Sequence, residues 1–150
     1  MRFPVLNIFL ILTMSLNSGA QSPDSAKYQS LDPYYFHLEY LKQDPALLID
    51  VRQSFEYRGK RIKDAINISS SRDLEITADT ISKETAFFLY CSTDYRSIAA
   101  AELLYKKGFR KLYNLEGGIV AWRREGFPVE KGKVKTAKSQ RRKTRKTIMP

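Results

Sequence analysis

The thiol of Cys91 is the most nucleophilic group that this sequence offers, and it belongs to the chain's single cysteine. Cys91 opens the segment CSTDYRS, in which four residues separate it from Arg96. A thiolate is the reactive form of cysteine, and a nearby guanidinium favours that charged form. A lone cysteine is more often an inert buried side chain. The choice between these readings depends on the elements that position the thiol.

Two elements flank Cys91. The run AFFLYC (86–91) is short and continuously apolar, which is typical of a strand buried on both faces of a parallel sheet. The segment SIAAAELLYKKG (97–108) predicts a helix with Ser97 as its N-cap and Gly108 at its C-terminus. Residues 91–96 then form a loop at the carboxyl end of the sheet, where α/β folds bind ligands. Its backbone N–H groups and the helix dipole favour an anion there, first of all the thiolate.

Strands and helices alternate elsewhere in the chain. ALLID (46–50), INIS (66–69) and KLYNL (111–115) predict further strands. LDPYYFHLEYLKQD (31–44) predicts a helix with Asp32 as N-cap and Pro33 at its first position. This alternation predicts an α/β fold, with a mostly parallel central sheet and helices on both faces. The sequence contains no internal repeat, which disfavours a solenoid.

The N-terminus carries one arginine, an apolar stretch and then small residues up to Ala20. This pattern predicts a secretory signal peptide over residues 1–20 and an exported, periplasmic or secreted protein. The alternative is an uncleaved membrane anchor, but the apolar stretch is shorter than the roughly 20 residues that span a bilayer. Export would leave Cys91 as a free thiol in an oxidising compartment.

The C-terminal residues 131–150 contain nine Lys and Arg and no acidic residue. Apart from those nine and Arg2, the chain's 26 basic residues are balanced by its 16 acidic residues. We therefore expect one neutral domain over residues 21–130 and a disordered basic tail. The tail is either a solvated segment or one that binds an anionic membrane or cell-surface polymer. Nucleic acid is disfavoured as a partner because the tail lacks aromatic residues for stacking.

Taken together, residues 28–129 resemble the rhodanese-like family of sulfurtransferases. CSTDYR has the length of that family's active-site loop in many members. LLIDVR, SFEY and IKDAINIS are similar to its first signature, and LYNLEGGIVAWRREGFPV is similar to its second. The related cysteine-dependent phosphatases place five residues between cysteine and arginine, so the four found here disfavour phosphatase or arsenate-reductase chemistry.

The resemblance implies a sulfurtransferase that carries sulfur as a persulfide on Cys91, taken from thiosulfate or a persulfide donor and passed to a thiol or cyanide. It implies a monomer with no metal and no organic cofactor. The site residues that it implies fall into three groups: Cys91 and Arg96 as catalytic residues; Ser92, Thr93, Asp94, Tyr95 and Ser97 as substrate contacts; and Asp50, Arg52, Glu56, Gly117, Gly118 and Trp122 as structural residues near the site.

Asp94 departs from the family pattern, in which glycine is common at this position. A carboxylate beside the thiolate would repel an anionic donor such as thiosulfate, unless Arg96 or Arg52 pairs with it. An alternative function follows from this departure. In it the chain is a non-catalytic rhodanese-like binding module whose pocket or basic tail recognises an anionic partner.

Overall fold

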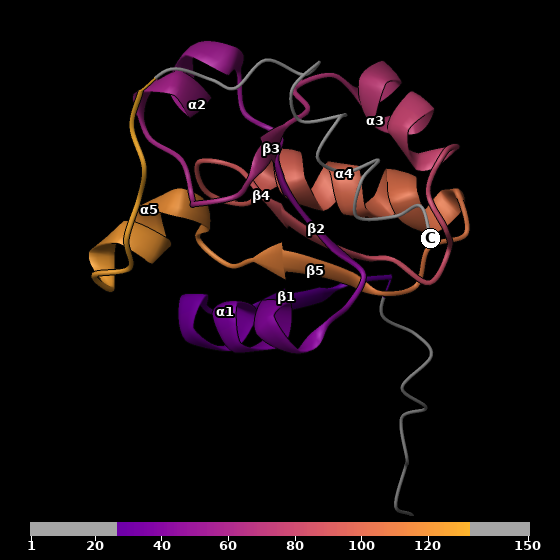
Figure 1. Ribbon diagram of the computed structural model, residues 1–150, viewed down its shortest axis with the longest axis horizontal. Coiled ribbons are helices and arrows are strands. Elements are labelled where there is room, and N and C mark those ends of the chain that lie inside the picture. Colours follow the sequence, from indigo (N-terminus) through magenta and orange to yellow (C-terminus); the bar gives the residue numbers. More distant parts are fainter. Residues whose placement is uncertain (1–26, 133–150) are drawn as a thin grey trace, which may run out of the picture.

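The computed structural model describes residues 27–132 (Figure 1). The predicted signal peptide and all but the first two residues of the predicted basic tail lie outside the described residues. The described chain alternates strands and helices in the order β1 (Gln29–Leu31), α1 (Pro33–Lys42), β2 (Ala46–Asp50), α2 (Ser54–Gly59), β3 (Ile66–Asn67), α3 (Ser71–Ala78), β4 (Ala86–Tyr90), α4 (Tyr95–Lys106), β5 (Leu112–Leu115) and α5 (Gly118–Arg124).

The five strands form one sheet in the order β1-β5-β4-β2-β3, and every neighbouring pair is parallel. This confirms the α/β fold predicted from the sequence. The central strand β4 pairs with β2 from Ala46–Ala86 through Asp50–Tyr90 and with β5 on its other side. All five of its residues are buried, as its continuously apolar sequence predicts.

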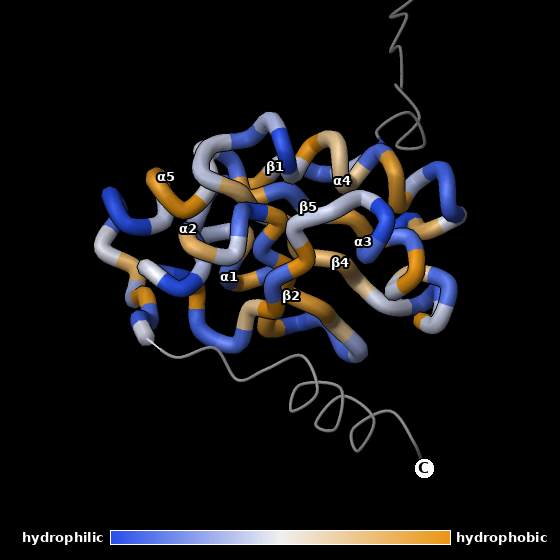
Figure 2. Tube along the Cα trace, turned by 90° about the horizontal axis from the view of Figure 1, so that it is seen from above, coloured by the Kyte–Doolittle hydropathy of each residue, from blue (hydrophilic) through white to orange (hydrophobic). Residues whose placement is uncertain are grey.

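Two apolar cores cover the two faces of the sheet, because successive strand side chains point to opposite sides. Phe87 and Leu89 belong to the core under α3 and α4. Phe88 and Tyr90 belong to the core that also contains apolar side chains of α1, α2 and α5. Figure 2 shows the apolar stretches of β2 and β4 inside the domain and polar turns around its edge. No helix within residues 27–132 is long and apolar enough to cross a membrane.

The ends of two helices test the capping predictions. At the start of α1, Asp32 Oδ1 accepts a hydrogen bond from the Tyr35 N–H at 2.9 Å, as predicted. The prediction for α4 was wrong, because this helix begins at Tyr95 with Asp94 as its N-cap residue. The Ile98 N–H already donates to the Asp94 carbonyl at 3.0 Å, so Ser97 lies inside the first turn. The active-site loop is therefore shorter than residues 91–96, and Arg96 belongs to the helix.

Candidate active site

Cys91 directly follows β4 and is 2% exposed. The carbonyl oxygens of Cys91 and Ser92 accept hydrogen bonds from the N–H groups of Ile119 and Val120 in α5, at 3.0 and 3.3 Å. The C=O and N–H of a trans peptide point in opposite directions. The N–H groups of Ser92 and Thr93 therefore face away from α5. The loop thus presents backbone donors on one side while its carbonyls are held on the other, which suits an anion.

Two glycines allow α5 to approach the loop this closely. Gly117 and Gly118 have φ values of +67° and +57°, in the left-handed region that favours glycine. A Cβ on Gly118 would lie 2.5 Å from the carbonyl oxygens of both Cys91 and Thr93. The glycine pair expected near the site is thus in direct contact with the backbone of the loop.

The carboxylate of Asp94 is held by the turn between β5 and α5. Both of its oxygens lie 3.1 Å from the N–H of Gly117, and Oδ1 accepts a further hydrogen bond from Asn114 Nδ2 at 3.1 Å. Neither Arg96 nor Arg52 neutralises Asp94, because each arginine pairs with another carboxylate. The Asp94 side chain therefore fixes the shape of the loop.

Arg96 pairs with Glu56 of α2. Its Nη1 lies 2.8 Å from Glu56 Oε2, and its Nη2 donates to Glu56 Oε1 at 3.1 Å and to Ser92 Oγ at 3.0 Å. Ser92 Oγ in turn donates to Glu56 Oε1 at 2.8 Å. The hydrogen bonds from Arg96 and Ser92 lower the pKa of Glu56 to about 2, although partial burial of the carboxyl group acts in the opposite direction. The same ion pair raises the pKa of Arg96. Sequence reasoning placed Glu56 near the site but missed that it anchors the loop.

Asp50 and Arg52 form a buried ion pair at the end of β2. The distance from Arg52 Nη2 to Asp50 Oδ2 is 2.6 Å, and the same nitrogen donates to the Lys60 carbonyl at 2.6 Å. Because both side chains are buried and paired with each other, they support the loop that follows β2. Trp122 is also buried, and its Nε1 donates to the Pro128 carbonyl at 3.0 Å. All three side chains are thus buried and hydrogen-bonded within the domain.

The remaining predicted substrate contacts differ in their surroundings. Ser97 is buried in the first turn of α4, and its Oγ lies 3.5 Å from Cys91 Sγ and 3.0 Å from the Asp94 carbonyl. Thr93 and Tyr95 are exposed, and Tyr95 is 85% exposed. The structure thus brings Ser92, Arg96 and Ser97 around the base of the loop and leaves Tyr95 on its surface.

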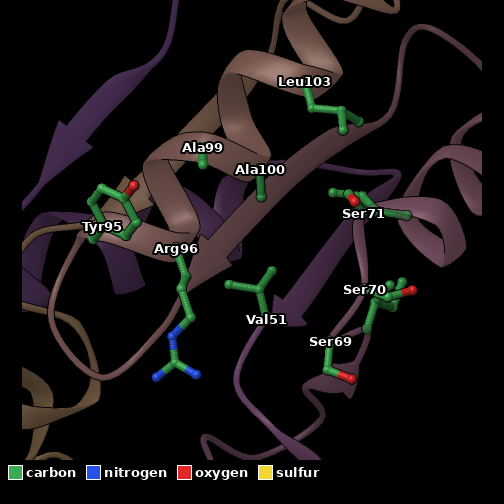
Figure 3. A pocket seen from close by; sticks show the side chains of 11 residues that line it. Val51, Ser69, Ser70, Ser71, Tyr95, Arg96, Ala99, Ala100 and Leu103 are labelled. Atoms are coloured by element: carbon green, nitrogen blue, oxygen red, sulfur yellow. The ribbon is translucent and has the colours of Figure 1, made fainter.

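A cleft of about 290 Å³ begins beside Arg96 and runs between α3 and α4 (Figure 3). Its walls combine apolar side chains with the three consecutive serines at positions 69–71. Figure 3 shows Arg96 and Val51 on one side of these serines, with Ala100 and Leu103 of α4 along the cleft. Sequence reasoning did not identify this cleft, because its lining residues come from three separate segments of the chain. No group of three His, Cys, Asp or Glu side chains in the described part of the chain could hold a metal ion.

Comparison with known proteins places this geometry in a family. The family model described as "Rhodanese-like domain" matches residues 37–125. A protein of Allochromatium vinosum named sulfurtransferase is 33% identical over 86 residues, which cover 57% of this chain and 79% of that protein. The crystal structure of a rhodanese-related protein from Thermoplasma volcanium is 30% identical with a TM-score of 0.58, and the match covers 69% of this chain and 98% of that one.

Other relatives are longer proteins. The tRNA uridine(34) hydroxylase of Chlamydia caviae is 31% identical over 99 residues, which cover 61% of this chain and 30% of that protein. This chain spans about half or less of the length of the first curated relatives that it matches. The family match nevertheless includes β4, the Cys91 loop, Arg96 and the glycine turn, so this chain belongs to the rhodanese-like domain family.

Proposed function

We propose that this protein is a sulfurtransferase that carries sulfane sulfur on Cys91. The observation that carries the proposal is the arrangement of the loop. Its carbonyls at Cys91 and Ser92 bond to α5, its N–H groups face away from α5, and Arg96 lies in the first turn of the helix that follows. The relative named sulfurtransferase in Allochromatium vinosum supports the same chemistry.

The reaction proceeds in two displacements. The Cys91 thiolate attacks the outer sulfur of thiosulfate, an S–S bond forms at Cys91, the donor's S–S bond breaks, and sulfite leaves. With a persulfide donor, the leaving group is a thiolate. An acceptor thiolate then attacks the outer sulfur on Cys91, and the enzyme thiolate is regenerated as the acceptor becomes a persulfide. The loop N–H groups and Arg96 stabilise the charged sulfur between the two steps.

Two further parts of the proposal concern regions outside the described residues. Residues 1–20 direct the protein for export, and the basic tail attracts an anionic surface. In the non-catalytic alternative, the negative charge of Asp94 beside the thiolate prevents catalysis. The hydrogen bonds from Gly117 and Asn114 to this carboxylate favour the enzyme, because they give Asp94 a structural purpose.

Intact mass measurement tests the proposal. Residues 21–150 are treated separately with thiosulfate and with a small organic persulfide, and Cys91→Ser is treated in parallel. We expect the wild-type protein to gain one sulfur atom, which cyanide then removes, and the variant to gain none. The donor that loads faster identifies the donor class. A folded and reduced protein that neither donor loads would refute the sulfurtransferase and favour the binding module.

A further inference from the structure

A second cleft, of about 470 Å³, lies between α2 and α5. Figure 1 shows these two helices at the same end of the domain. Four of the lining residues are basic and one is acidic: Arg52, Lys60, Arg123 and Lys131, with Glu56. The cleft is therefore positively charged, although the domain as a whole is close to neutral.

Among residues 27–132, three of these four positive charges have no ion-pair partner. Arg52 is neutralised by its ion pair with Asp50 at 2.6 Å. Within residues 27–132, Lys60, Arg123 and Lys131 form no ion pair with any carboxylate. Arg123 and Lys131 are exposed and Lys60 is half-buried. Positive charges gathered in a concave surface concentrate anions from solution.

The cleft adjoins the reactive centre through two of its lining residues. Glu56 forms part of the cleft wall and bonds both Ser92 and Arg96. Ile119 also lines the cleft, and its N–H bonds the Cys91 carbonyl. A molecule in this cleft therefore lies against two residues that hold the loop, Glu56 through its carboxylate and Ile119 through its backbone N–H.

The charged side chains at the loop give little net attraction for an anionic substrate. Arg96 is neutralised by Glu56 at 2.8 Å. The Asp94 carboxylate is bound by neutral donors, so its negative charge is not cancelled by a cation. The backbone N–H groups of the loop act at short range, so the positive side chains of the neighbouring cleft are the source of longer-range attraction for an anionic substrate at this face.

We propose that the cleft between α2 and α5 binds the negatively charged groups of a small organic thiol or persulfide that exchanges sulfur with Cys91. The ligand class is a thiol that carries carboxylates or similar groups several bonds away from its sulfur. The inference rests on the proposed function and names the substrate class of that site. In the step concerned, the bound thiolate forms an S–S bond with the outer sulfur on Cys91, the bond from that sulfur to Sγ breaks, and the Cys91 thiolate is released.

Single-turnover sulfur transfer tests the proposal with two acceptors that carry the same thiol group and differ in charge. The full chain is loaded with sulfur and then mixed with glutathione, which carries two carboxylates, or with its diethyl ester, in which both are masked. The variant is Lys60→Gln with Arg123→Gln. The matched control is Lys63→Gln with Arg124→Gln, which removes two positive charges from exposed residues outside the cleft.

We expect the cleft variant to transfer sulfur to glutathione roughly three- to tenfold more slowly than the wild type. Its rate with the diethyl ester should stay within about twofold of the wild type, and the control should match the wild type with both acceptors. Added salt should reduce the wild-type rate with glutathione more than the rate with the ester. Equal slowing with both acceptors, or no slowing with either, would overturn the proposal.

A binding measurement separates this inference from the sulfurtransferase proposal. If Cys91 cannot be loaded, the proposed function fails, and S-methylglutathione is titrated into the full chain and followed by NMR. Shifts at the amides of Lys60 and Arg123 that weaken in the cleft variant would uphold an anion site. The absence of these shifts would refute the anion site, whether or not Cys91 accepts sulfur.

Discussion

Asp94 shows how one side chain can have a different purpose from the one its charge suggests. From sequence, its carboxylate appears only as a negative charge close to a thiolate. In the structure it accepts hydrogen bonds from Gly117 and Asn114 and joins the loop to the turn after β5. The sequence could not reveal this, because Asn114 lies 20 residues away and reads as a polar interruption of a strand.

Substitutions at Asp94 separate the two interpretations. Asp94→Asn keeps an oxygen that can accept from both Gly117 and Asn114, so we expect near wild-type stability. Asp94→Ala removes the hydrogen bonds from both donors and leaves a buried donor on Asn114 and a half-buried one on Gly117, and should cost about 1–3 kcal/mol. Denaturant unfolding measures the stability of each variant, and thiosulfate loading rates are measured in parallel. If both variants load faster by the same factor, charge repulsion governs the site instead.

At the scale of elements, strong strands and the first helix cap could be predicted, and weaker elements could not. β2 and β4 were predicted from continuous apolar runs because both of their faces are buried. β1 was missed because QSL carries no apolar pattern and forms the edge of the sheet beside β5. The start of α4 was misplaced because Ser97 has the residue type of an N-cap, while tertiary contacts draw its hydroxyl toward Cys91.

The junction of α5 with the loop gives a prediction about Gly118. In Gly118→Ala the new Cβ meets backbone carbonyls at 2.5 Å, in addition to a positive φ. We expect a loss on the order of 2–4 kcal/mol in stability and a large loss of sulfur loading, because the loop must move. Gly126→Ala is the matched control, since its φ is also positive but nothing lies within 4 Å of the new Cβ.

The control variant, Gly126→Ala, should lose only about 1 kcal/mol of stability and keep the wild-type rate of sulfur loading on Cys91. Thermal unfolding and intact mass after thiosulfate treatment measure the two effects. Similar losses in both variants would mean that backbone conformation alone, and not contact with the loop, explains the glycine at position 118.

At the scale of the whole molecule, the parallel sheet explains why distant motifs form one site. The carboxyl ends of β2, β4 and β5 meet at one edge, which brings Arg52, Cys91 and Gly117 into neighbouring loops. The alternation of strand-like and helical segments along the chain was enough to predict the α/β fold. The pairing of Arg96 with Glu56 and the two clefts could not be predicted, because they depend on the positions of side chains that lie far apart in the sequence.

The ion pair between α2 and α4 predicts how the stability of the molecule changes in acid. The pKa of Glu56 in the folded protein, about 2, lies below the ordinary value of 4.5 for this side chain. The stabilisation of the folded state by the ionised Glu56 carboxylate is therefore complete above about pH 5 and is lost as the pH falls towards 2. Glu56→Gln should cost on the order of 1 kcal/mol at neutral pH, and the difference from the wild type should shrink over that acidic range.

Urea unfolding between pH 2 and 7 measures this difference. Glu116→Gln is the control, because Glu116 is exposed and takes part in no ion pair of residues 27–132. It should show no such acid dependence. A Glu56→Gln difference that stays constant with pH would mean that the ion pair does not stabilise the fold.

The main-chain hydrogen bonds from α5 to the loop also bear on how this protein can diverge. Ile119 and Val120 bond the carbonyls of Cys91 and Ser92 through backbone atoms, which every residue except proline supplies. Exchanging the exposed side chains of Thr93 and Tyr95 removes neither bond. Natural variation or directed evolution can therefore change the surface that meets a substrate while the scaffold around the thiol is inherited intact.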